Sequence, residues 1–252
     1  MKTIQAYIST KQAEFSQHPF FTRLAQHAPL AEVLPFAKAL SFWIMSFQDI
    51  LRLNETMVKD PVLKKIAYGH KAEDAGHELW FLNDLLTLEE KLPDIRFLFG
   101  REHTQTRDAS YALVAEVFGA KSDLERIALV LALESTGHVF FERIATYLEE
   151  TNFPRYNEFR YFSRKHLDVE LDHEVFEDDQ EELIENLPMT AEQELACKQL
   201  IDRAYVSFYA MFDHLEAVTR PAPVLETPKA SVAQPLFAQQ DATSAAVQPA
   251  WN

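Results

Sequence analysis

Apolar residues recur three and four positions apart along most of the chain, which is the spacing of one buried helix face. No segment shows the apolar–polar alternation of a strand, and only 5 of the 252 residues are glycine. The pattern predicts helices over residues 2–17, 30–57, 61–88, 106–118, 123–150, 154–186 and 191–218. We therefore expect an all-α bundle of about seven or eight helices.

Capping residues indicate where several of these helices begin. Asp60 is a suitable N-cap with Pro61 in the first turn behind it, and Ser122 and Thr190 are suitable N-caps for two later helices. Pro154 is expected to open a further helix, because proline is tolerated in the first helical turn.

The C-terminal part of the chain changes composition after the last helix. The segment from Arg220 onward holds five of the twelve prolines, together with many Ala, Gln, Ser and Thr residues. Such a composition cannot bury enough apolar surface to order itself. We expect a helical domain over 1–218 and a disordered tail over 219–252.

Charge and cysteine content exclude several classes of function. The net charge is −15 and no basic cluster appears, so neither nucleic-acid binding nor binding to an anionic membrane is expected. The apolar stretch at 36–47 is too short to span a bilayer, and the N-terminus has no long apolar segment. The single cysteine, Cys197, cannot form an intramolecular disulfide. These features predict a cytoplasmic protein.

Three of the predicted helices carry His and carboxylate residues on one face. The first holds His70, Glu73, Asp74 and His77, the second holds Glu134 and His138, and the third holds His166, Glu170 and His173. Residues three, four and seven positions apart share a face of an α-helix, so each set projects in one direction. Five of the nine histidines fall in these three sets.

Two interpretations of these sets are open. A single His–Glu pair on a helix is usually structural or exposed. Three sets beside apolar and aromatic residues are costly to bury unless they pair or bind a metal. Carboxylate and imidazole groups that project inward from several helices are the ligands of di-iron and di-manganese proteins. The three sets together therefore indicate a metal centre more strongly than any one pair does.

Two of the sets repeat the pattern Glu-x-x-Gly-His, in EDAGH at 73–77 and ESTGH at 134–138. Glycine inside a helix costs about 1 kcal/mol relative to alanine. We expect Gly76 and Gly137 to lie within helices, where the missing side chain lets a neighbouring helix or a bound ligand approach closely.

Four features of the sequence together resemble the haem-oxygenase-like di-metal oxidases and oxygenases. They are HPFF after the first helix, HKAEDAGHELWFLNDL, the mid-chain Glu134 and His-x3-Glu-x2-His. That family shares its helical fold with haem oxygenase, the thiaminase-like proteins and pyrroloquinoline quinone synthase. The resemblance covers the layout of residues 1–218 but only about a dozen residues in its motifs.

The resemblance implies a metal site and a cofactor. It assigns His77, Glu134, His166, Glu170 and His173 as ligands of two Fe2+ ions, with manganese as an alternative at one site. Many members have a Glu seven residues before the first-helix His, and this chain has His70 there. The remaining carboxylate is then assigned to Glu73, with Asp74, His70 and His138 as further ligands or as partners of ligands.

The resemblance also implies an activity. Its members use dioxygen to oxidise or cleave a small amino-acid-like or fatty-acid-like metabolite, and the fold is compatible with a homodimer. Aromatic residues near the motifs are candidates for the substrate pocket, namely Trp43, Phe47, Trp80, Phe140, Phe141 and Phe162. Two alternatives stay open: a metal-independent oxidase or thiaminase-like hydrolase on the same fold, and a non-enzymatic helical binding protein.

Overall fold

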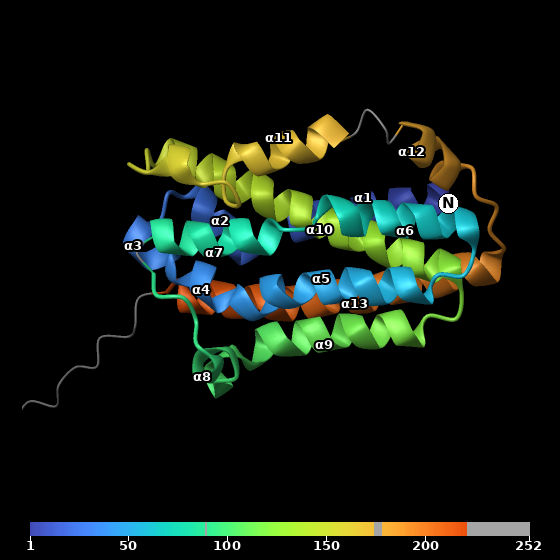
Figure 1. Ribbon diagram of the computed structural model, residues 1–252, viewed down its shortest axis with the longest axis horizontal. Helices are drawn as coiled ribbons and strands as arrows, with labels where there is room; N and C mark the ends of the chain where they lie inside the picture. The colour runs from blue at the N-terminus through green and yellow to red at the C-terminus, as the bar shows by residue number, and fades with distance from the viewer. Residues whose placement is uncertain (89, 174–177, 221–252) are drawn as a thin grey trace, which may run out of the picture. The chain divides into compact units, whose positions relative to one another are not determined.

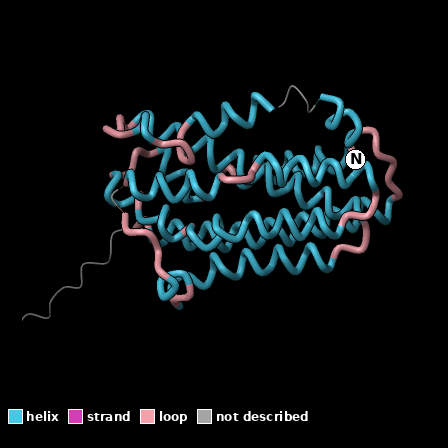
Figure 2. The backbone as a smooth tube through the Cα atoms, in the orientation of Figure 1, coloured by secondary structure: helices cyan, strands magenta, loops and turns pink. Residues whose placement is uncertain are grey.

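The computed structural model describes residues 1–88, 90–173 and 178–220 of the chain. Within these ranges the chain forms α-helices and short 3₁₀ segments but no β-strand (Figure 2), which confirms the all-α class. Eight of the described α-helices have ten or more residues, and the other five are shorter. From residue 221 onward, the predicted tail lies outside the described residues.

The helices are, in chain order, α1 (Lys2–Phe15), α2 (Pro19–Ala25), α3 (Leu30–Val33), α4 (Pro35–Ala39), α5 (Ser41–Met57), α6 (Pro61–Glu73), α7 (His77–Thr87), α8 (Ile95–Leu98), α9 (Thr104–Gly119), α10 (Asp123–Glu150), α11 (Arg164–His173), α12 (Asp178–Glu185) and α13 (Ala191–Val218). The short 3₁₀ segments are η1 (Arg101–His103) and η2 (Tyr156–Glu158). All described residues belong to one compact unit, Met1–Pro221.

Two 28-residue helices, α10 and α13, pack against each other at the centre of this unit (Figure 1). Helix α10 also packs against α1, α6 and α11, while α13 packs against α9. Most of α10 is buried on more than one side, as expected for a helix enclosed by others. This arrangement brings α6 and α11 against α10, and these three helices, together with the start of α7, carry the predicted donor sets.

The predicted caps are confirmed at three helix starts. The Asp60 side chain accepts hydrogen bonds from the backbone N–H groups that open α6, and Ser122 does the same for α10. Thr190 caps α13 in a reciprocal capping box with Gln193. These signals are local, which is why the sequence alone predicts them.

The helix predicted over 30–57 is wrong as a single element. Proline at position 35 has no N–H to continue the α3 hydrogen bonds, so the chain starts again as α4, and a further break precedes α5. Within the described residues no single helix is long and apolar enough to cross a bilayer. Leu30–Ala39 and Ser41–Met57 meet those criteria only jointly, as a pair bent by 40°.

The helix predicted over 61–88 is also interrupted. Gly76 has a φ of +94°, in the left-handed region, and separates α6 from α7. A residue with a Cβ is strained in this conformation, so glycine suits it. The prediction that Gly76 lies inside a helix is therefore wrong.

The helix predicted from Pro154 does not start there. Irregular backbone and the short segment η2 precede α11, which begins only at Arg164. The buried carboxylate of Asp84 accepts hydrogen bonds from the backbone N–H groups of Arg160 and Phe162. These bonds hold the loop in a non-helical path, because its donors are paired with a side chain instead of the preceding turn.

Candidate metal centre

The break at Gly76 sets the geometry of the first donor set. Asp74 caps the C-terminus of α6, and His77 is the first residue of α7. The turn between them brings Asp74 Oδ1 to 3.0 Å from His77 Nδ1. His77 is buried and Asp74 half-buried, so the pair is partly removed from solvent.

His166 of α11 completes a chain of three donors. Its Nδ1 lies 2.9 Å from the carbonyl oxygen of Tyr161, and its Nε2 lies 3.1 Å from His77 Nδ1. Because a carbonyl only accepts, His166 carries its hydrogen on Nδ1, and in the neutral ring the lone pair is on Nε2. That lone pair points at His77, beside Asp74. A backbone carbonyl that holds one imidazole nitrogen in this way is the usual support of a metal-binding histidine.

A second pair faces the same space from α6 and α10. His70 Nδ1 contacts Glu134 Oε1 in an ion pair, which links the last turns of α6 to the middle of α10. The Glu134 side chain is 46% exposed, so one side of this carboxylate is open to solvent. Glu134 is thus accessible to an incoming ion.

Both groups of donors border one open cleft of about 770 Å³, here called the donor cleft. Its lining includes the predicted site residues His70, Glu73, Asp74, His77, Glu134 and His138. His166 adjoins it through its contact with His77. Glu170 and His173 belong to α11 by their backbone, and their side chains lie outside the described part of the structure.

Glu73 and His138 lie at the edge of the arrangement. Glu73 is half-buried and His138 is exposed, and both line the donor cleft. Among the residues whose side chains are described, no three His, Cys, Asp or Glu groups stand in an arrangement ready to hold an ion. His77 and His166 contact each other, and α11 carries two further predicted donors beyond them.

No protein-family model matches the chain, and no curated protein matches its sequence. The interpretation of the donor cleft therefore depends on the chemistry of its own residues.

Aromatic rings cover the histidine pair. Trp80 packs on His77 with ring centroids 4.2 Å apart, and Phe141 packs on His166 at 3.9 Å. The Arg160 guanidinium lies 3.7 Å from the Trp80 ring centre, on the solvent side. These rings limit the access of water to both imidazoles, which strengthens electrostatic interactions between them and their partners.

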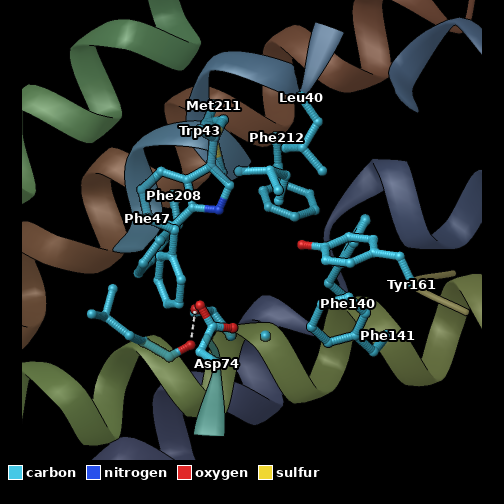
Figure 3. Close-up of a pocket in the computed structure, with 14 residues that line it drawn as sticks. Leu40, Trp43, Phe47, Asp74, Phe140, Phe141, Tyr161, Phe208, Met211 and Phe212 are labelled. Carbon is cyan, nitrogen blue, oxygen red and sulfur yellow. Dashed lines mark hydrogen bonds between the residues drawn. The ribbon is translucent and has the colours of Figure 1, made fainter. Parts of the chain in front are cut away.

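A second cavity lies beside the donor cleft and is here called the inner cavity (Figure 3). Phe140 and Phe141 line it, as their proposed place in a substrate pocket requires. Phe162 packs instead against Phe36 and Phe81 in the core and lines neither cavity. Trp80 also lines neither, because its ring is occupied by His77 and Arg160.

Two groups that support the donors were missed by the sequence analysis. Gln48 of α5 donates a hydrogen bond of 2.7 Å to Asp74 Oδ2, and the Tyr161 carbonyl orients His166. Gln48 has no sequence signal, because it reaches the site only through the packing of α5 on α6. A backbone carbonyl has no sequence signal either.

The two glycines of the repeated motif have different roles. Gly137 lies inside α10 as predicted, but no neighbouring helix approaches it: an added Cβ would meet only Phe141 Cε2, at 3.8 Å. The explanation by close helix packing is therefore wrong for Gly137. The other explanation, that the missing side chain leaves space for a bound ligand, agrees with the place of Gly137 in the lining of both cavities.

Cys197 lies away from both cavities, in α13. It is fully buried, and burial raises the pKa of its thiol to about 12. A cysteine nucleophile must ionise and meet substrate. The nucleophile that a thiaminase-like hydrolase needs is thus not supplied by Cys197.

Proposed function

We propose that the protein is a non-haem di-iron oxidase or oxygenase that uses dioxygen to oxidise or cleave a small metabolite. The observation that carries this proposal is the meeting of four helices at the donor cleft. The end of α6, the start of α7, the middle of α10 and the start of α11 contribute carboxylate and imidazole groups in or beside one partly enclosed space. Carboxylates suit hard divalent ions and imidazoles suit iron.

The donor set fits such a centre on chemical grounds. Asp74, His77 and His166 would hold metal on one side, and Glu134 with His70 on the other. Glu170 and His173 follow His166 at spacings of one and two helical turns and would complete the set. Iron held in this way supplies the electrons that reduce dioxygen beside a bound substrate.

The remaining residues orient the donors and exclude water. Gln48 occupies Asp74 Oδ2 and leaves Oδ1 directed at His77. The Tyr161 carbonyl keeps the His166 lone pair on Nε2. Trp80 and Phe141 cover the two imidazole rings. Each of these contacts fixes a ligand before metal arrives, which lowers the cost of assembling the site.

His70 occupies the position at which many members of the resembled family have a Glu ligand. Within this proposal, Asp74 supplies that carboxylate instead. Asp74 contacts His77 directly, whereas Glu73 only borders the cleft. The motif EDAGH contains two neighbouring acidic residues, and their contacts differ. We therefore prefer Asp74 to Glu73 as the ligand.

The test is metal binding under anaerobic conditions. We expect protein reconstituted with ferrous iron and then desalted to retain about two irons per chain. Glu134→Ala and His166→Ala should lose most of that iron. Asp74→Asn should lose iron, while its matched neighbour Glu73→Gln should retain it. Iron content by mass spectrometry and Mössbauer spectra of ⁵⁷Fe-loaded protein measure these outcomes.

Failure has a clear form. Wild-type protein that retains no iron would contradict the metal proposal and favour a metal-independent enzyme or a binding protein. Equal iron loss in Asp74→Asn and Glu73→Gln would contradict only the assignment of Asp74. Ferrous iron should also raise the melting temperature of the wild type, because a ligand that binds only the folded state stabilises it.

A further inference from the structure

The donor cleft and the inner cavity share part of their walls. Phe47, Asp74, Leu133, Gly137 and Phe141 line both. A molecule held at the donors thus has the inner cavity directly beside it.

The inner cavity is lined mainly by aromatic and aliphatic side chains from α5, α10 and α13. Figure 3 shows Tyr161 opposite Trp43 and Phe47, with Asp74 between them at the end nearest the donors. Both Asp74 oxygens already have partners, Gln48 and His77. The rest of the lining is mainly apolar and therefore suits an apolar group, while Asp74 faces the donors that the proposed function assigns to metal.

The size of the cavity limits that group. Its volume is about 60 Å³. A cavity of about 150 Å³ holds one benzene, which has six carbons, so each carbon takes roughly 25 Å³. The inner cavity therefore holds about two to three carbon-sized groups.

Gly137 lines both cavities and adds no side chain to the wall that they share. An added Cβ would meet only Phe141, at an ordinary van der Waals distance of 3.8 Å. The surrounding protein does not need glycine at this position for packing. A side chain at 137 would instead enter space that both cavities share.

We propose that the substrate carries a short apolar chain, that about two to three of its carbons lie in the inner cavity beside Gly137, and that residue 137 sets the accepted length. This inference rests on the proposed function for the identity of the bound molecule as a substrate. The chemistry of the tail follows from the cavity alone. The reacting part of the substrate lies at the donors, beside Asp74.

The test uses straight-chain primary alcohols from ethanol to 1-decanol as probes, because their polar end is constant. Dissociation constants are measured by ligand-observed NMR on the full chain, both loaded with ferrous iron under anaerobic conditions and free of metal. We expect affinity to rise about fourfold for each added methylene up to about three carbons, and then to level off.

The variants test the role of position 137. Gly137→Ala should level off at a chain about one carbon shorter, and Gly137→Leu should abolish the dependence on length. Gly119→Ala is the matched control, since its added methyl also meets nothing within 4 Å and it lines neither cavity. Melting temperatures of all variants establish that each is folded.

The outcomes separate this inference from the proposed function. If affinity shows no levelling, or if Gly137→Ala and the wild type accept the same lengths, the inference is overturned even where iron is retained. If the wild type shows the expected length dependence but retains no iron, the inference about the cavity stands and the di-iron proposal fails.

Discussion

At the residue scale, Asp84 links the core to the candidate site. Its side chain is 1% exposed and accepts hydrogen bonds from the backbone N–H groups of Arg160, at 3.0 Å, and Phe162, at 2.9 Å. Burial raises the pKa of Asp84, and these donors act in the opposite direction by favouring its charged form. The bonds fix the loop that presents Tyr161 and His166 to the donor cleft.

We expect Asp84→Ala to lower the free energy of unfolding by about 3 kcal/mol, because it leaves two N–H groups without their charged acceptor. Urea denaturation measures the change. Asp94→Ala is the control, since Asp94 caps the short helix α8 at the surface and its loss should cost only about 1 kcal/mol. Equal costs for the two substitutions would show that the Asp84 bonds do not stabilise this loop.

At the scale of elements, the two motif glycines should respond oppositely to the same substitution. Gly76→Ala forces a Cβ into the left-handed region and should destabilise by about 1 kcal/mol, although no atom obstructs it. Gly137→Ala adds a methyl inside α10 and should stabilise by roughly 0.5–1 kcal/mol. For a chain of this length, melting temperatures should shift by about 2–4 °C in opposite directions. Shifts of the same sign would contradict the difference in backbone conformation.

The same two motifs show how far sequence predicts local structure. Caps such as Asp60, Ser122 and Thr190 act within a few residues, so the starts of α6, α10 and α13 were predicted correctly. EDAGH and ESTGH have the same pattern, yet one breaks a helix and the other continues it. That choice depends on packing around α7 and α10, which a five-residue motif does not contain.

Prediction of the site was limited for a similar reason. His70, Asp74, His77 and Glu134 all border one cleft. His77 reaches it from α7, beyond the break at Gly76, so the helical spacing used for the prediction does not explain its place there. The contact of Asp74 with His77 needed the break at Gly76, which the assumption of a continuous helix excluded. Partners from other elements can be found only from the fold.

At the scale of the whole molecule, buried histidines make stability depend on pH. His103 of η1 and His214 of α13 are neighbours, with ring centroids 5.7 Å apart, and each has a buried ring nitrogen without a hydrogen-bond partner among the described residues. Burial lowers the pKa of both histidines. At His103 the nearby Glu102 opposes this effect, whereas Arg107 and Lys38 reinforce it. At His214 the neighbouring His103 lowers the pKa further. Neither ring is thus readily protonated in the folded protein.

We therefore expect the protein to lose stability as the pH falls below about 6.5, the ordinary histidine pKa in an unfolded chain. Below that value the unfolded chain binds protons that the folded state resists, and each such group costs at most about 1.4 kcal/mol for every further pH unit. The double variant His103→Phe with His214→Phe should show a smaller drop in melting temperature between pH 7.5 and 5.5. Phenylalanine keeps the ring that packs on Phe97 and removes the proton site.

The control His27→Asn changes an exposed histidine in a left-handed conformation that asparagine tolerates, so its pH profile should match the wild type. An unchanged profile in the double variant would assign the acid sensitivity to other groups, of which His18, also buried with a lowered pKa, is the next to substitute.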